Sequence, residues 1–217
     1  AMLVGPVLVA PRETPQIKTR CIDVGRLWLG RTSRQAERAV LDELSATPAN
    51  RLVALRGTSR WVHSLHKLSL PPASEGAQWL RDGGVYVITG GLGGIALEIA
   101  EHAARLKKVK LALLARSELP PNEEWDDVLR VLPEESIGAQ RMRRIRSIRQ
   151  LGSEVEVFTC DISDRDRVES ALQQVRAKLG AVTGVIHAAG VMDDEPIESK
   201  SLESMQRVLL PKVAGAI

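Results

Sequence analysis

The chain has 217 residues, of which 44% are hydrophobic and 26% charged, and its formal net charge is +3. These values are typical of a globular protein long enough for one large domain or two small ones. No apolar run approaches the 18 residues of a membrane span, the start lacks the features of a signal peptide, and four His without paired spacing argue against a metal site. Two isolated cysteines, Cys21 and Cys160, predict buried thiols in a reducing cytoplasm.

The first part of the chain contains several short predicted strands. Val7–Val9 and Cys21–Val24 are apolar runs of strand character. Leu52–Arg56 and Arg60–His66 predict a β-hairpin with a three-residue loop.

An amphipathic helix is predicted over residues 32–45. Thr32 and Gln35 have the spacing of a capping box, in which two side chains satisfy amide groups at a helix start. The apolar side of this helix holds Ala36, Val40, Leu41 and Leu44.

A segment rich in proline and small residues, 71–76, is typical of a linker. We therefore expect two parts, residues 1–80 and residues 81–217.

Residues 85–106 carry the most informative pattern, a strand, a glycine turn and a helix. Val85–Ile88 is an apolar run typical of a buried strand, and Ile95–Leu106 has apolar residues at helical spacing. Between them, Gly91-x-Gly93-x-x-Ala96 fits a dinucleotide fingerprint, in which glycines let backbone amides approach a diphosphate at the positive end of a helix. The candidate cofactor residues of this turn are Thr89, Gly90, Gly91, Leu92, Gly93, Gly94 and Ile95. A glycine-rich turn with no ligand is the alternative.

The second predicted strand, Val109–Ala115, ends in Arg116 and Ser117. An acidic residue near this position would favour a free ribose 2′-hydroxyl, whereas a guanidinium and a hydroxyl suit a 2′-phosphate. The pair therefore favours NADPH over NADH. The alternative is a surface arginine at a strand end.

The third predicted strand, Glu154–Cys160, is followed by Asp161 and Ile162. Asp161 either bonds the adenine amino group of a cofactor or helps to cap the next helix. Ser163 and Asp166 already have the spacing of a capping box, so capping does not require Asp161.

The fourth predicted strand, Thr183–His187, runs into Ala188, Ala189 and Gly190. Small residues at the carboxyl end of a strand would let a nicotinamide ribose lie against the backbone. Close packing of the strand against a helix would also require small residues here.

A dense basic cluster follows the second strand, formed by Arg141, Arg143, Arg144, Arg146 and Arg149. Such a cluster can bind nucleic acid or an acidic protein. However, Met142, Ile145 and Ile148 give the same segment an apolar edge, and no aromatic residues interleave to stack on bases. We therefore favour a solvated helix docked by one edge, with no nucleic-acid partner.

The motifs TGGLGGIA, LLARS, CDISD, HAAGVMDD and LLPKVAGA, in this order, resemble the ketoreductase domain of modular or iterative polyketide synthases, in the short-chain dehydrogenase/reductase superfamily. The segments GPVLVAP, RCIDV and LVALRGTSRWVHSLHKL resemble the structural subdomain that precedes the catalytic part, and residues 120–149 resemble a long insertion. The resemblance implies an α/β fold, a Rossmann-like parallel sheet in an NADPH-binding catalytic subdomain (81–217), preceded by a smaller, truncated Rossmann-like structural subdomain (1–80).

The same resemblance implies an activity and partners. Hydride would pass from NADPH to the β-keto carbon of an acyl thioester on an acyl carrier protein, beside other domains of the same synthase. Lys212, within Pro211-Lys212-Val213, matches the lysine that binds the nicotinamide ribose and lowers the pKa of the catalytic tyrosine. Met192-Asp193-Asp194 resembles the Leu-Asp-Asp motif of B-type ketoreductases, so Asp194 implies a D-hydroxyl product. A solvated helix lysine and a solvated loop acid are the respective alternatives.

The family's catalytic Ser and Tyr have no counterpart, because the only tyrosine is Tyr86, in the first strand of the predicted sheet. We therefore expect this chain to be incomplete at its carboxyl end. A non-catalytic scaffold, or a short-chain reductase that acts on free small carbonyls with NADPH, are the alternative functions.

Overall fold

The computed structural model describes residues 3–25, 34–46, 50–69 and 79–216. The chain forms two compact units, one of residues 1–71 with 194–200, and one of residues 72–193 with 201–217. No helix within the described ranges is long and apolar enough to cross a membrane. The predicted cap residue Thr32 and the linker 71–76 lie outside these ranges.

The first unit contains a three-stranded sheet in the order β1-β2-β3. β1 (Cys21–Val24) runs parallel to β2 (Leu52–Arg56), which pairs antiparallel with β3 (Ser59–Val62). The hairpin loop has two residues instead of the three predicted, because Arg56 pairs directly with Ser59. β3 is also shorter than predicted, since it ends at Val62.

The strand predicted at Val7–Val9 is wrong, because these residues lie in helix α1 (Val4–Glu13). A three-residue apolar run has no period that separates strand from helix. Pro11 lies inside the helix and lacks the amide that would bond to the carbonyl of Val7. The hydroxyl of Thr19 donates to that carbonyl at 2.5 Å instead.

Helix α3 (Arg34–Ser45) forms where a helix was predicted, but its packing differs. Leu41 and Leu44 are exposed, whereas Glu43 is buried. The Glu43 carboxylate accepts hydrogen bonds from Arg60 on β3 at 2.5 and 2.9 Å and lies 3.0 Å from Arg20 Nη1. An ion-pair cluster therefore joins this helix to the hairpin, where the sequence pattern indicated apolar contact.

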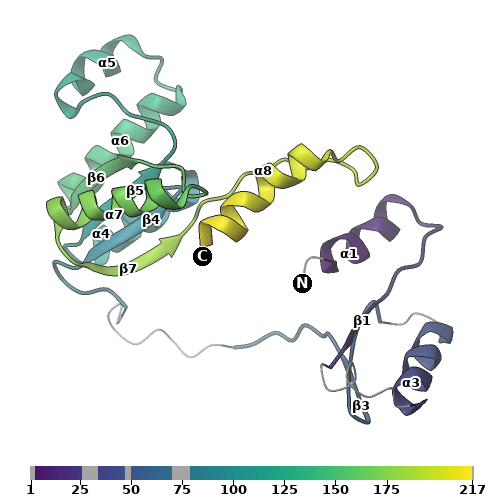
Figure 1. The fold of residues 1–217 in the computed structure, drawn as a ribbon. Coiled ribbons are helices and arrows are strands. Elements are labelled where there is room, and N and C mark those ends of the chain that lie inside the picture. The colour runs from purple at the N-terminus through teal and green to yellow at the C-terminus, as the bar shows by residue number, and fades with distance from the viewer. Residues whose placement is uncertain (1–2, 26–33, 47–49, 70–78, 217) are drawn as a thin grey trace. The chain divides into compact units, whose positions relative to one another are not determined.

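The second unit is built on a four-stranded parallel sheet in the order β6-β5-β4-β7 (Figure 1). The strands are β4 (Val85–Thr89), β5 (Lys110–Ala115), β6 (Glu154–Thr159) and β7 (Val182–His187). The helices are α4 (Gly94–Leu106), η1 (Asn122–Glu124), α5 (Trp125–Val131), α6 (Ile137–Gln150), α7 (Arg165–Leu179), α8 (Leu202–Val213) and η2 (Ala214–Ala216). The predicted Rossmann-like parallel sheet is confirmed.

Both faces of this sheet are covered by helices. On β5, Leu111 and Leu113 belong to a core cluster with α4 and α6, and Ala112 and Leu114 belong to a second cluster with α7 (Figure 1). Burial on two faces explains the continuous apolar runs of the strands. All four strands are parallel, so their carboxyl ends meet at one edge of the sheet.

Candidate functional site

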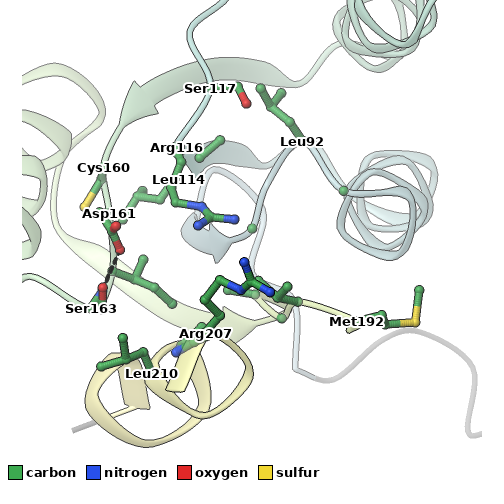
Figure 2. Close-up of a pocket in the computed structure, with 18 of the residues that line it drawn as sticks. Leu92, Leu114, Arg116, Ser117, Cys160, Asp161, Ser163, Met192, Arg207 and Leu210 are labelled. Atoms are coloured by element: carbon green, nitrogen blue, oxygen red, sulfur yellow. Dashed lines mark hydrogen bonds between the residues drawn. The ribbon is translucent and has the colours of Figure 1, made fainter. Parts of the chain in front are cut away.

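A cleft of about 610 Å³ lies at the carboxyl edge of the sheet in the second unit (Figure 2). The segments after β4, β5, β6 and β7 line it, and α8 contributes a further wall. Of the residues predicted for the cofactor, the cleft brings together Gly90, Leu92, Gly93, Arg116, Ser117, Asp161, Ile162, Ala189 and Gly190. Parallel sheets bind ligands at this edge, so the fold itself designates the cleft as the candidate site.

The glycine turn after β4 is pressed against the sheet. Gly90 has a φ of +64°, and a Cβ there would lie 2.7 Å from the Cα of Ala189. A Cβ on Gly91 would lie 2.6 Å from the Cβ of Leu113, and its amide donates to the carbonyl of Leu114 at 2.9 Å. Both glycines are therefore required by close approach to neighbouring strands, with or without a ligand.

The start of α4 has a different character. Gly93 is the N-cap and no side chain caps the helix, so the first amides have no partner within the helix. A Cβ on Gly94 would meet nothing within 4 Å. Ile95 is 74% exposed, and the buried face begins at Ala96. This helix end is consequently open, and its amides are suited to an anion.

Arg116 and Ser117 are both exposed directly after β5. Figure 2 shows the side chains of Arg116 and Arg207 extending into the cleft from the end of β5 and from α8. The charge of Arg116 also contributes to lowering the pKa of Asp161, so these two residues are close enough to interact.

Asp161 is held by a turn of its own segment. Its carboxylate accepts hydrogen bonds from the amide of Ser163 at 3.0 Å and from its hydroxyl at 2.6 Å, and these bonds are the main reason why the pKa of Asp161 is lowered. The predicted capping box at Ser163 is wrong, because Asp164 is the N-cap of α7 and accepts from the amides of Asp166 and Arg167. Asp161 is thus free of the capping role and faces the cleft.

The two cysteines differ in exposure. Cys160 is buried at the end of β6, and burial raises the pKa of its thiol. Cys21 is partly exposed, which contradicts its predicted burial.

Thr89 and the segment after β7 form one connected group. The Thr89 hydroxyl lies 2.9 Å from Nδ1 of His187 and accepts from the amide of Ala189 at 3.4 Å. Thr89 is buried, so it ties the ends of β4 and β7 together and does not line the cleft. Ala188, Gly91, Gly94 and Ile95 are also outside the lining residues.

Lys212, on α8, is not among the residues that line the cleft, but its side chain lies beside one that is. A Cβ on Gly190 would lie 3.3 Å from the Nζ of Lys212, so the lysine side chain lies against the segment that follows β7. Asp193, in that same segment, accepts from Ser204 and Arg207 of α8 at 2.8 and 2.6 Å. Asp194 is exposed and falls in the first unit.

The sequence matches a protein family described as the KR domain over residues 84–217, more than half of the chain. The chain belongs to this ketoreductase family. It is a ketoreductase domain of the polyketide synthase type, within the short-chain dehydrogenase/reductase superfamily, as the motifs predicted.

Individual relatives agree with this assignment. The domain is 40% identical over 156 residues to 6-methylsalicylic acid synthase of Penicillium expansum, covering 71% of this chain and 8% of the synthase. It is 31% identical over 180 residues to polyketide synthase PksM of Bacillus subtilis (strain 168), covering 83% of this chain and 4% of that protein. The solved ketoreductase from the first module of phoslactomycin biosynthesis in Streptomyces sp. HK803 has a TM-score of 0.73 at 25% identity, over 98% of this chain and 44% of that one. This chain therefore spans only a small part of either synthase.

The basic cluster of this ketoreductase domain is largely paired within the fold, as a docked helix predicts. Arg143 pairs with Glu134, Arg144 with Glu98 and Glu101, and Arg146 with Asp126. Arg149 donates to the carbonyl of Val155 and to Asn122. The predicted apolar edge of Met142, Ile145 and Ile148 is buried.

Several lining residues of the ketoreductase cleft were not predicted. They are Leu114, Ala115, Arg141, Cys160, Ser163, Val191, Met192, Asp193, Arg207, Leu210 and Pro211. The sequence did single out Asp193, since it lies within the motif Met192-Asp193-Asp194. Arg141 and Arg207 lie on helices remote in sequence from the glycine turn, and the sequence marked Arg141 only as a member of the basic cluster.

Proposed function

We propose that this domain reduces a β-ketoacyl thioester, carried by an acyl carrier protein, to the β-hydroxyacyl thioester with NADPH, beside other domains of a cytoplasmic polyketide synthase. The single observation that carries the proposal is the cleft itself, which gathers the glycine turn, Arg116 with Ser117, Asp161, and the contact of Gly190 with Lys212. Domains of this family bind nicotinamide cofactors, which supply the hydride. We also retain the proposed division into a structural subdomain (1–80) and a catalytic subdomain (81–217).

The residues fit a phosphorylated dinucleotide. The open start of α4, where Gly94 leaves space that a Cβ would enter, would receive the diphosphate. The exposed guanidinium of Arg116 and the hydroxyl of Ser117 would bind the ribose 2′-phosphate by charge-assisted hydrogen bonds. The carboxylate of Asp161 would accept from the adenine amino group, and Ile162 would lie against the base.

Lys212 would act at the other end of the cleft. Its ammonium group lies against Gly190, where the nicotinamide ribose would rest, and would donate to the ribose hydroxyls. A positive charge here would also lower the pKa of a tyrosine that donates a proton to the forming alkoxide. Tyr86 does not fit this role, since its buried hydroxyl accepts from the amide of Arg81 and donates to the carbonyl of Trp79. Asp194 would guide the substrate toward the D-hydroxyl product.

Calorimetry on the full-length protein tests the cofactor assignment. Arg116→Ala should weaken NADPH binding by about tenfold or more, because a charge-assisted hydrogen bond contributes about 1.5–3 kcal/mol. NADH binding should change little, and Arg130→Ala, which removes an exposed arginine paired with Asp127, should change neither. Equal NADPH affinity in the wild type and Arg116→Ala would reject Arg116 as the phosphate ligand.

Reduction of a β-ketoacyl substrate by the full-length protein tests the catalytic assignment. Lys212→Ala should slow reduction by more than about tenfold, which corresponds to roughly 1.4 kcal/mol of barrier. Chiral analysis of the product tests Asp194, whose replacement by Asn should reduce the excess of the D-hydroxyl product. Nucleotide binding without any reduction would support the non-catalytic scaffold instead.

A further inference from the structure

The arginines of α6 do not all have the same surroundings. Arg143, Arg144 and Arg146 each face a carboxylate, and Arg149 is held by a carbonyl, an amide oxygen and the ring of Trp125. None of these four lines the cleft. Arg141 does line it, and it has no carboxylate partner among the residues described.

One hydrogen bond fixes Arg141 to the glycine turn. Its Nε donates to the carbonyl of Leu92 at 2.9 Å, across 49 positions of sequence. Leu92 lies between Gly91 and Gly93, directly before the open start of α4. A guanidinium has five N–H donors, and this bond uses one of them. The remaining donors are therefore held beside the turn without any other partner in the described ranges.

The positive charge at the start of α4 is too small to neutralise a bound diphosphate, so a further cation is needed there. A diphosphate carries two negative charges, whereas the start of a helix supplies only about half a positive charge. Arg207 is paired with Asp193 on the opposite wall, and Arg116 lies after β5. Arg141 is the cleft arginine that is bonded to the turn itself, and its half-buried position strengthens its interaction with an anion.

We infer that Arg141 binds the diphosphate of the dinucleotide, while its bond to Leu92 holds the glycine turn in place. The inference rests on the proposed function, because it assumes that the cleft takes a dinucleotide. It assigns to the insertion between β5 and β6 a part in cofactor binding, separate from the proposed 2′-phosphate site at Arg116 and Ser117.

Two small probes separate these sites in calorimetry on the full-length protein. ADP-ribose carries the diphosphate without a 2′-phosphate, whereas adenosine 2′-monophosphate carries the 2′-phosphate without a diphosphate. Arg141→Ala should weaken ADP-ribose, NADH and NADPH by a similar factor of about tenfold or more, and leave adenosine 2′-monophosphate unchanged. Arg116→Ala should weaken adenosine 2′-monophosphate and NADPH, and should leave ADP-ribose and NADH nearly unchanged. Arg143→Ala, which removes a neighbouring arginine that faces Glu134, should alter no affinity.

Other outcomes overturn the inference. Unchanged affinity of Arg141→Ala for ADP-ribose would exclude a diphosphate role, and so would a loss confined to NADPH. If Arg141→Ala does not fold, Arg141→Lys decides: it keeps the charge but loses the bond geometry, and a smaller loss restricted to diphosphate ligands is expected. If the wild-type protein binds none of the four nucleotides, the proposed function fails first. Wild-type binding with no difference in Arg141→Lys or Arg141→Ala would refute only the role of Arg141.

Discussion

The buried hydroxyl of Ser204 donates a hydrogen bond of 2.8 Å to the carboxylate of Asp193, and so joins α8 to the segment that follows β7. Arg207 donates to the same carboxylate oxygen at 2.6 Å. Lys212 lies on the same helix, two turns further on. The position of this lysine beside Gly190 therefore depends on a bond near the opposite end of α8.

Loss of the Ser204 hydroxyl should cost stability and loosen α8. We expect Ser204→Ala to lower the free energy of unfolding by about 1 kcal/mol, and Asp193→Ala by about 2 kcal/mol, since the latter leaves a buried hydroxyl without its acceptor. Urea unfolding of both variants and of the double variant measures the coupling between them. Glu195→Gln, a change at an exposed neighbouring acid, serves as control, and additive losses in the double variant would show that the bond contributes nothing.

Two glycines of the turn should respond in opposite ways to alanine. Gly91→Ala places a methyl group 2.6 Å from the Cβ of Leu113, and overpacking of this kind typically costs about 1–3 kcal/mol. Gly94→Ala meets open space at the first residue of α4 and should keep or raise stability by up to about 1 kcal/mol. If α4 receives a diphosphate, Gly94→Ala should still weaken nucleotide binding. Thermal unfolding and calorimetry on the same samples separate the two effects, and a stable Gly94→Ala protein with full affinity would contradict the proposed contact.

The Glu43 cluster predicts a pH dependence in the first unit. Hydrogen bonding from Arg60 is the main reason why the pKa of Glu43 lies below its ordinary value of 4.5, and the charge of Arg20 adds to the effect. The unfolded chain therefore binds more protons than the folded one below about this pH, and stability rises with pH there. The contribution is complete above the ordinary pKa and is lost as the pH falls through the lowered one.

Hydrogen exchange of the β2 and β3 amides should detect this loss. Their protection should fall as the pH drops below the ordinary pKa of Glu43 in the wild type, and Glu43→Gln should be less protected at pH 7 with a flatter pH profile. Glu37→Gln, on the exposed side of the same helix, should keep the wild-type profile. An unaltered profile in Glu43→Gln would show that the carboxylate does not stabilise the folded state.

Trp125 should anchor the insertion between β5 and β6. Its ring is buried, its Nε1 donates to the carbonyl of Pro120 at 2.8 Å, and the guanidinium of Arg149 lies 5.1 Å from the ring centre. Trp125→Ala should cost about 3–5 kcal/mol, and Trp125→Phe, which loses mainly the hydrogen bond, about 1 kcal/mol. Trp61→Phe, at an exposed position, should stay within about 0.5 kcal/mol. Equal losses in the two Trp125 variants would assign the effect to the hydrogen bond alone.

The parallel sheet was predictable from the sequence because its strands are covered on both faces. Leu111 to Leu114 on β5 are all fully buried, so the strand is a continuous apolar run that composition alone marks. The glycine turn was equally visible, since Gly90 and Gly91 are demanded by backbone contacts with Ala189 and Leu113. Features that depend on local steric requirements can therefore be predicted from the residue types alone.

Other features depend on contacts between distant segments. Helix α1 contains the apolar run Val7–Val9, and its Pro11 is tolerated because Thr19 supplies a donor from outside the helix. The bond from Arg141 to Leu92 joins two elements that only the folded sheet brings together. The cap of α7 was displaced by one residue because Ser163 is already engaged by Asp161. Each of these three features depends on a hydrogen bond to a residue that rules based on sequence spacing do not consider.

The strand order β6-β5-β4-β7 has one more consequence. The chain builds outward from β4 through β5 to β6 and then crosses back to place β7 on the other side of β4, with α7 on the opposite face from α4 and α6. Winding therefore reverses at β4, and the cleft lies at the carboxyl edge of the sheet, where such a reversal forms a crevice. Its existence is a property of the topology, so substitutions along its walls should alter which ligand binds there without closing the crevice.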